Sequence, residues 1–283
     1  MMNKKLIEQY LHPLSTLPTS LSPRGSLKQN IECILFDIYG TLFISSSGDI
    51  NWGQQNPPPH EQLKQLLARY AIAESPRRIL EKLHETIEAR HGVLRNRGVD
   101  HPEVIIEHIW RQVLKINDLS TIKQFAVEFE LITNPVGPMP HLASMLSACR
   151  KKNLLMGIIS NAQFYTPFLF NWFLHSDIEA LGFDPGLLFY SYRYEIAKPS
   201  PILFKMAAEQ VAKKGIQPAA VLYIGNDMLN DIYPASAIGF QTALFAGDRR
   251  SLRLRGDDPR CADLRPELVL TDLGQLAQRL SVF

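Results

Sequence analysis

The sequence of 283 residues contains only three cysteines, no long apolar run and no excess charge of either sign. Cys33, Cys149 and Cys261 are too scattered for a disulfide framework, and no Cys-x-x-Cys pair offers a zinc site. No run approaches the ~18 apolar residues of a membrane-spanning helix. A formal net charge of +2 provides no global field for nucleic acid or acidic membranes. We therefore expect a cytoplasmic protein that binds neither nucleic acid nor membranes, with any anion site local.

The residues that are present are those of a folded chain with a sizeable core. Hydrophobic residues make up 46% of the sequence and charged residues 20%, which excludes a disordered chain. The length fits two domains or one large domain. Residues 1–30 stand apart, because Pro13, Pro18 and Pro23 interrupt them and no apolar stretch of a signal peptide follows the positive start. We expect an N-terminal extension there, either packed on the body or mobile.

The first structural signal is an apolar, β-branched run at residues 31–36, which ends at Asp37 and leads into Gly40. A buried strand followed by a turn has this pattern. After the breaker-rich stretch at residues 134–140, apolar runs alternate with helical periods. These runs are nearly all apolar, which predicts a parallel sheet with helices on both faces. The predicted strands lie at 154–159, 187–191, 220–224 and 241–245.

Residues 45–135 show a different pattern, with about four amphipathic helices in succession and no strand between them. Ser75 before Pro76 predicts the start of the second helix, and Pro102 predicts the start of the third. The predicted fold class is therefore α/β, a Rossmann-like parallel sheet with an inserted all-helical domain. Its parts are an extension at 1–30, a core at 31–44 and 136–283, and the helical insertion at 45–135.

Polar side chains follow four of the predicted strands. In open α/β sheets ligands bind beyond the carboxyl ends of the strands, where such side chains converge. A carboxylate nucleophile, hydroxyl and amide donors, a cation and further carboxylates would meet at one point. The residues are Asp37 with Thr41, Ser160 with Asn161, Lys198, and Asp227 with Asp231.

The order and spacing of these residues resembles the haloacid dehalogenase superfamily of hydrolases over residues 31–250. That family inserts a helical cap between its first and second motifs, where this chain has its helical insertion. The short stretch between Asn161 and Lys198 leaves no room for a cap at the other insertion point. The four matching segments are Phe36-Asp37-Ile38-Tyr39-Gly40-Thr41-Leu42, Ile158-Ile159-Ser160-Asn161, Ala197-Lys198-Pro199-Ser200-Pro201-Ile202-Leu203-Phe204 and Tyr223-Ile224-Gly225-Asn226-Asp227-Met228-Leu229-Asn230-Asp231.

The resemblance implies a role for each residue of the motifs. Asp37 would attack the electrophilic centre and form a covalent ester or acyl phosphate that water later cleaves. Ser160, Asn161 and the backbone amides after Asp37, at Gly40 and Thr41 among others, would hold the oxygens of the substrate. Lys198 would neutralise charge on Asp37 and on the transferring group.

The resemblance also implies a Mg²⁺ site. Asp37, the backbone carbonyl of Tyr39 and Asp227 would supply hard oxygen ligands, and Asp231 would support the ion directly or through water. Mg²⁺ prefers a few protein carboxylates together with substrate oxygens and waters, and this set has that composition.

Tyr39 departs from the phosphatases that the chain resembles, which carry at this position an Asp that protonates the leaving group. A tyrosine, with an ordinary pKa of about 10 against about 3.9 for aspartate, cannot serve as both acid and base near neutral pH. The haloacid dehalogenases carry Tyr there and expel halide, which needs no proton. Asp227, in contrast, is a metal-ligand position that a metal-free dehalogenase is not expected to keep. The two motifs therefore indicate different reactions.

Three functions follow from this conflict. We favour a Mg²⁺-dependent phosphatase that acts on a small phosphorylated metabolite through an aspartyl-phosphate at Asp37. The clustered negative charge of a metal site is unfavourable for the fold and has no use unless a cation binds there. The first alternative is 2-haloacid dehalogenase-type hydrolysis through an ester at Asp37. The second is a binding or regulatory protein that kept the fold and turns over weakly.

Selectivity for a small anionic substrate would lie in the helical insertion. His91 and Arg95 share a helix face at i, i+4 and are candidates to contact the substrate, although a solvated basic face has the same pattern. The charged segment 249–260 is expected to be a solvated loop. We expect a monomer or a homodimer.

Overall fold

The computed structural model describes residues 7–46 and 59–280. Its main sheet consists of β1 (Arg24–Gly25), β2 (Cys33–Phe36), β5 (Leu155–Ser160), β6 (Phe183–Tyr190), β7 (Val221–Gly225), β8 (Gln241–Phe245) and β9 (Leu268–Leu270). The strand order is β1-β9-β8-β7-β2-β5-β6. Neighbouring strands are parallel apart from β1 and β9, which are antiparallel. The predicted α/β fold with a parallel sheet is confirmed.

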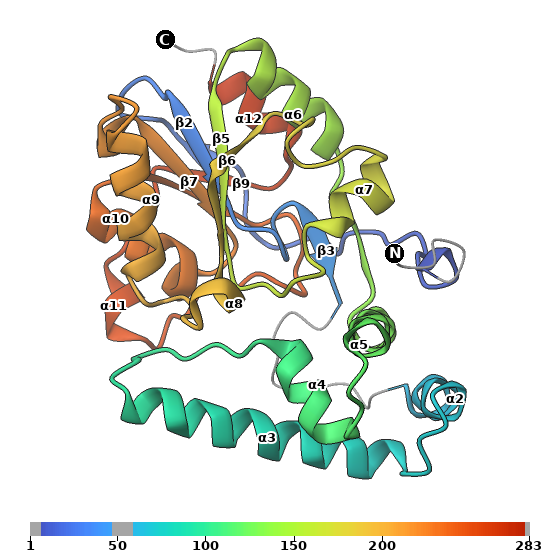
Figure 1. Cartoon of the computed structure of the whole chain (residues 1–283). Helices are drawn as coiled ribbons and strands as arrows, with labels where there is room; N and C mark the ends of the chain where they lie inside the picture. Colours follow the sequence, from blue (N-terminus) through green and yellow to red (C-terminus); the bar gives the residue numbers. More distant parts are fainter. Residues whose placement is uncertain (1–6, 47–58, 281–283) are drawn as a thin grey trace.

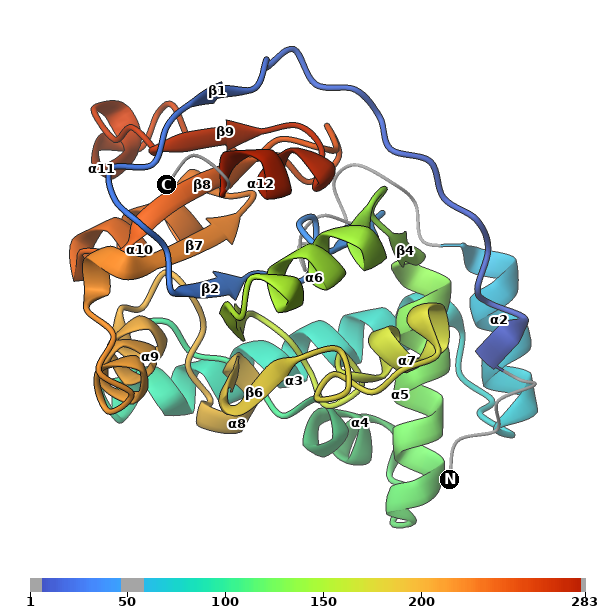
Figure 2. The same ribbon diagram turned by 90° about the horizontal axis from the view of Figure 1, so that it is seen from above.

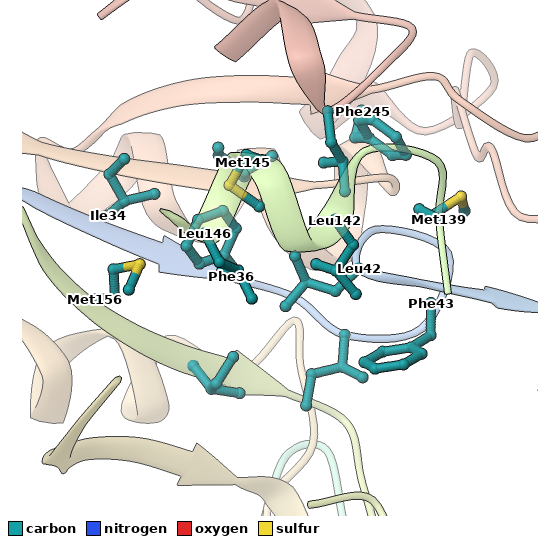
Figure 3. Close-up of a cluster of buried hydrophobic side chains, with 14 of the residues drawn as sticks. Ile34, Phe36, Leu42, Phe43, Met139, Leu142, Met145, Leu146, Met156 and Phe245 are labelled. Atoms are coloured by element: carbon teal, nitrogen blue, oxygen red, sulfur yellow. The ribbon is translucent and has the colours of Figure 1, made fainter. Parts of the chain in front are cut away.

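Helices cover both faces of this sheet, as predicted (Figure 1). The side chains of β2 alternate between the two faces, so that Cys33 and Leu35 join one apolar cluster and Ile34 and Phe36 another. Figure 3 shows Ile34 and Phe36 of the second cluster beside the helix that covers it. The first face carries α9 (Ile202–Ala212) and α10 (Tyr233–Ile238), and the second carries α6 (Leu142–Lys151), α7 (Phe168–Leu174) and α12 (Gly274–Arg279).

Four further helices lie below the sheet in Figure 1. They are α2 (His60–Arg69), α3 (Pro76–Asn96), α4 (Ile106–Leu114) and α5 (Leu119–Thr133). Trp110, Phe125 and Phe129 form the centre of a separate apolar cluster, with ring centroids 4.9 Å and 4.6 Å apart from Trp110 to the two phenylalanines. We call these four helices the cap. The chain enters and leaves the cap through the antiparallel pair β3 (Phe43–Ser45) and β4 (Val136–Pro138).

One predicted start of a cap helix is confirmed and one is wrong. The Ser75 side chain accepts from the backbone N–H of Arg78 and caps α3, as predicted. Pro102 does not begin α4, which starts four residues later, at Ile106. The reason is a tertiary contact, because Pro102 forms an antiparallel bridge with Ile196 of the core and its backbone is therefore extended.

The N-terminal segment from residue 7 onward is packed on the body of the protein. Figure 2 shows it passing from the cap, near α2, around the outer edge of the sheet to β1 and then into β2. Thr19 Oγ1 donates to the carbonyl of Ala246 at 2.9 Å, and Arg249 N–H donates to the carbonyl of Leu17 at 2.9 Å. The packed form of the predicted extension is therefore the observed one for these residues.

The loop after β8 agrees only in part with the sequence prediction of a solvated segment at 249–260, because it is exposed at residues such as Arg249 and Leu254 but packed around Ser251. Ser251 is buried, and the backbone of Arg253 pairs with that of Asn226 and Met228. The loop is thus packed against the segment after β7. The remaining elements are α8 (Ser191–Tyr194), η1 (Pro218–Ala220), η2 (Met228–Ile232) and α11 (Pro259–Ala262).

Two expectations from composition can be compared with the described residues. All three cysteines are buried and free of disulfides. No helix in the described ranges is long and apolar enough to cross a membrane.

Candidate active site

Three neighbouring strands end in the residues that the sequence singles out. In the sheet β2 lies between β5 and β7, parallel to both. Asp37 follows β2 directly, and its backbone N–H donates to the carbonyl of Ile224 in β7 at 2.9 Å. Ser160 is the last residue of β5. Because the carboxyl ends of parallel strands meet at one edge of a sheet, these side chains come together there.

The Asp37 carboxylate is held by two donors from other segments. Its Oδ1 accepts from Ser160 Oγ at 2.8 Å and from the ammonium of Lys198 at 2.8 Å. Asp37 is 6% exposed, so few water molecules compete for these bonds. Within the described residues no hydrogen bond uses Oδ2 of Asp37, which leaves this oxygen for attack on an electrophile.

Lys198 is the positive centre of the site. Its ammonium also donates to Asp231 Oδ1 at 2.5 Å and to the Tyr223 hydroxyl at 3.2 Å. Burial lowers the pKa of Lys198, but Asp231 and Asp37 outweigh burial and raise it. Burial raises the pKa of Asp231, and the charge of Lys198 opposes that effect. Lys198 is therefore a fixed cation that bridges two carboxylates.

Asn161 holds the backbone of Lys198. Its Oδ1 accepts from the Lys198 N–H at 2.8 Å, and its Nδ2 donates to the Lys198 carbonyl at 3.4 Å. These two bonds join the loop after β5 to the loop that carries the cation. The side chain that was predicted to contact substrate thus positions Lys198 in the structure.

The turn after Asp37 lies close to the loop after β8. Gly40 has a φ of +81°, and a Cβ at this position would lie 2.5 Å from the Cβ of Ser251. A larger residue at position 40 would therefore be strained in its backbone and would also clash with Ser251. The sequence motif requires glycine here for both reasons.

The same turn contains two backbone N–H groups without a partner among the described residues. Thr41 Oγ1 donates to Asn226 Oδ1 at 3.1 Å and so ties the turn to the end of β7. No backbone hydrogen bond among the described residues uses the N–H groups of Ile38 or Tyr39. These two N–H groups next to the nucleophile are suited to bind oxygens of an anionic substrate.

The Tyr39 side chain points toward the loop after β5, where its hydroxyl lies 3.1 Å from Thr166 Oγ1. Burial raises the pKa of Tyr39 far above its ordinary range, and Glu130 of the cap adds to that shift. The phenol therefore keeps its proton at any physiological pH. It can donate a hydrogen bond, but it cannot cycle a proton between a leaving group and water.

Asp227 faces a cation that no sequence motif predicted. Its Oδ2 lies 2.6 Å from Nη2 of Arg255, in the loop after β8. Its Oδ1 accepts from the backbone N–H groups of Leu229 and Asn230 and caps η2. Both oxygens of this predicted metal ligand are therefore occupied by donors of the protein.

The predicted Mg²⁺ ligands do not fit a metal site where the structure places them. Asp37 offers a free oxygen, but Asp231 accepts from Lys198 through one oxygen and from the N–H of Asp227 through the other. In the described parts of the chain, no group of three or more His, Cys, Asp or Glu side chains could hold a metal ion. Cations and N–H groups of the protein thus take the carboxylate oxygens that Mg²⁺ would need.

The two predicted substrate contacts in the cap lie beside a carboxylate of their own helix. His91 Nδ1 lies 3.5 Å from Glu88 Oε1, and Arg95 Nη1 lies 3.8 Å from Glu88 Oε2, all on α3. The cap instead reaches the core through Arg90, whose Nη2 lies 2.6 Å from Glu195 Oε1.

A buried carboxylate of the cap, Glu103, enters the core between the loops after β5 and β6. It is 5% exposed and accepts from Ser191 Oγ at 2.8 Å and from Gln163 Nε2 at 3.2 Å. Burial raises the pKa of Glu103 to about 7, although the hydrogen bonds from Ser191 and the Val104 N–H lower it. The segment between α3 and α4 therefore contacts the core through a buried carboxyl group that changes its charge near neutral pH.

Sequence reasoning missed three residues of this region. Tyr223 could have been found, because a tyrosine interrupts an apolar strand two residues before its end. Arg255 and Glu103 carried no such signal, since each acquires its partner only through the fold.

Comparison with known proteins agrees with this geometry. The sequence model of the haloacid dehalogenase-like hydrolase family matches residues 31–239. Solved structures with a similar fold include the 2-haloacid dehalogenase from Pseudomonas syringae pv. Tomato DC3000, at 20% identity and a TM-score of 0.56 over 89% of this chain and 98% of that chain. The L-2-haloacid dehalogenase from Xanthobacter autotrophicus with chloropropionic acid covalently bound has 18% identity and a TM-score of 0.51 over 89% and 99%.

At these identities the structural likeness concerns the fold. No curated protein matches the sequence. The family match covers most of the chain, including all four strand-end motifs. The chain belongs to the haloacid dehalogenase-like hydrolases.

Proposed function

We propose that this hydrolase cleaves a small carboxylate substrate of the 2-haloacid class through a covalent ester on Asp37. The observation that carries the proposal is the pairing of charges at the strand ends. Lys198 forms ion pairs with Asp37 and Asp231, and Arg255 forms an ion pair with Asp227. Within the described residues these three carboxylates and two cations leave one net negative charge. A substrate with a single negative charge meets less repulsion there than a doubly charged phosphate.

The reaction takes place in two steps. In the first, a carboxylate oxygen of Asp37 attacks C2 of the substrate, and the new O–C bond replaces the carbon–halogen bond while halide leaves with the bonding electrons. In the second, water attacks the ester carbonyl of Asp37 and releases the 2-hydroxy acid and a proton. Ser160 and Lys198 hold the carboxylate for the first step, and Lys198 stabilises the oxyanion of the second.

Tyr39 supports this reaction. Halide departs as a stable anion and needs no proton, so a tyrosine that stays protonated costs the first step nothing. The same residue is a handicap for alkyl phosphates, whose alkoxide leaving groups require a general acid.

A phosphatase that forms an aspartyl-phosphate at Asp37 is the second candidate. The backbone N–H groups of Ile38 and Tyr39 favour it, since they could bind phosphoryl oxygens. Activated acyl or aryl phosphates would be its substrates, because Tyr39 supplies no general acid. Mg²⁺ would be required, and Arg255 would have to leave Asp227.

The deciding experiment measures halide release from chloroacetate and 2-chloropropionate, with EDTA present, by wild-type protein and by Asp37→Asn. We expect release by the wild type only, because an amide is a poor nucleophile. Asp184→Asn is the matched control, since Asp184 pairs with Lys214 at 2.7 Å at the amino end of β6 and takes no part in the site.

Acetyl phosphate and p-nitrophenyl phosphate with Mg²⁺ are assayed in parallel. Phosphate release that depends on both Asp37 and Mg²⁺, with no halide release, would favour the phosphatase. No product from any of these substrates would contradict both reactions and leave the binding or regulatory role.

A further inference from the structure

Arg255 donates hydrogen bonds to the Asp227 carboxylate from two of its nitrogens. Its Nε lies 3.2 Å from each carboxylate oxygen of Asp227, and its Nη2 lies 2.6 Å from Oδ2. The Asp227 side chain is 8% exposed and that of Arg255 is 33% exposed. A forked, partly desolvated pair of this kind is stronger than an ordinary pair on the surface.

The backbone around Arg255 fixes this contact. The Met228 N–H donates to the Arg253 carbonyl at 2.9 Å, and the Arg253 N–H donates to the Asn226 carbonyl at 3.0 Å. The loop that carries Arg255 is therefore joined on both sides of Asp227 to the segment after β7. These backbone hydrogen bonds therefore hold the segment that carries Arg255 next to Asp227.

The residue beside the nucleophile turn is an amide. Asn226 accepts from Thr41 at 3.1 Å and donates from Nδ2 to the Ser251 carbonyl at 2.6 Å. Asp227, the next residue, turns its carboxylate toward Arg255. At the end of β7, the Asn226 amide thus contacts the turn after Asp37. The Asp227 carboxylate contacts the loop after β8, where Arg255 neutralises its charge.

We propose that Arg255 is a built-in replacement for a divalent cation at Asp227, so that the site functions without a metal and removal of the guanidinium creates a site for one. Lys198 already pairs with the other two carboxylates, and Arg255 completes the set. The inference shares its metal-free site with the proposed function, but it is tested by binding, without any substrate.

The experiment is a titration with Mn²⁺, followed by electron paramagnetic resonance and by competition with Mg²⁺. We expect no saturable binding to the wild type at millimolar ion. Arg255→Met should bind one Mn²⁺ per chain at least about tenfold more tightly, because loss of the guanidinium leaves the negative charge of Asp227 without a cation beside Asp231. Adding Asp227→Asn to Arg255→Met should remove this binding.

Arg260→Met is the matched control, because Arg260 lies nearby, in α11, and pairs with Asp258 at 2.8 Å. It should behave as the wild type. If Arg255→Met does not fold, Arg255→Gln, which also removes the positive charge, and the wild-type titration decide. Saturable wild-type binding that Asp227→Asn abolishes would overturn the inference, as would equal binding by wild type and folded Arg255 variants.

The two proposals fail separately. Wild-type metal binding together with halide release in EDTA would overturn the role of Arg255 and leave the proposed function standing. Absence of both metal binding and halide release would do the reverse.

Discussion

Tyr39 is the residue in which the chemistry of this site is most clearly visible. An acid–base residue must change its protonation state near the working pH, and burial together with Glu130 removes this tyrosine from that range. Its hydroxyl instead bonds with Thr166 in the loop after β5. At the position where a general acid would stand, Tyr39 therefore makes a structural contact with the loop after β5.

Tyr39→Phe should accordingly reduce halide release by less than about tenfold and leave the shape of its pH profile unchanged, because loss of a true acid–base group costs about 10²–10⁴-fold. Steady-state kinetics on 2-chloropropionate between pH 6 and about 10 measure both quantities. Tyr165→Phe serves as control, since Tyr165 bonds with Glu130 at 3.0 Å in the same region. A loss of a hundredfold or a missing limb of the profile would show that Tyr39 moves a proton.

The segment between α3 and α4 is the element that connects cap chemistry with the core. Glu103 N–H donates to the Glu195 carbonyl at 3.0 Å, and Ala197 N–H donates to the His101 carbonyl at 2.7 Å. The cap is thus joined by its backbone to the residues just before Lys198. The Glu103 carboxylate is buried by the same contact, which is why its pKa is raised.

Stability should depend on pH through Glu103. The unfolded chain releases this proton near its ordinary pKa of 4.5, whereas the folded protein keeps it to about 7. The folded state therefore binds more protons between these values, and its stability falls as pH rises from about 4.5 to about 7, by up to about 3 kcal/mol. Above this range the loss is complete.

Glu103→Gln should remove this part of the pH dependence. Urea unfolding at pH 5 and pH 7.5, with Glu88→Gln on the surface of α3 as control, measures the difference. Asp231 also has a raised pKa and contributes the same sign in every variant, so only the change between variants is informative. An identical slope in wild type and Glu103→Gln would contradict the assignment.

At the scale of the whole molecule, the N-terminal segment links the cap to the sheet. Ile7 is buried, the Tyr10 hydroxyl donates to Glu128 Oε2 of α5 at 2.9 Å, and Leu14 packs on Gly137 of β4. Further along, β1 adds to the edge of the sheet at β9. One continuous segment therefore contacts the cap, the strand where the cap joins the core, and the core itself (Figure 2).

Removal of residues 1–22, which spares β1, should lower the free energy of unfolding by about 2–4 kcal/mol, because it exposes the surfaces that bury Ile7 and Leu14. Amide hydrogen exchange should also become faster in β3 and β4. Urea unfolding and exchange measured by mass spectrometry give the two readouts. Unchanged stability and exchange would mean that the N-terminal segment does not stabilise the fold.

Strands and most helices could be predicted from the sequence because their patterns are local. The predicted strand 241–245 coincides with β8, and 154–159 differs from β5 by one residue at each end. The short β9 was missed, since three apolar residues make no periodic signal. Pro102 was misread because a tertiary bridge, and not local propensity, decides its conformation.

Local patterns and chain order were enough to predict that Asp37, Ser160 and Lys198 meet at one edge of a parallel sheet, because they specify where each strand ends. The ion pairs at that edge could be seen only in the folded protein. The partner of Asp227 comes from Arg255, 28 residues further along the chain, and Glu103 lies 88 residues from Ser191. Ion pairs between loops depend on distances that no local pattern records.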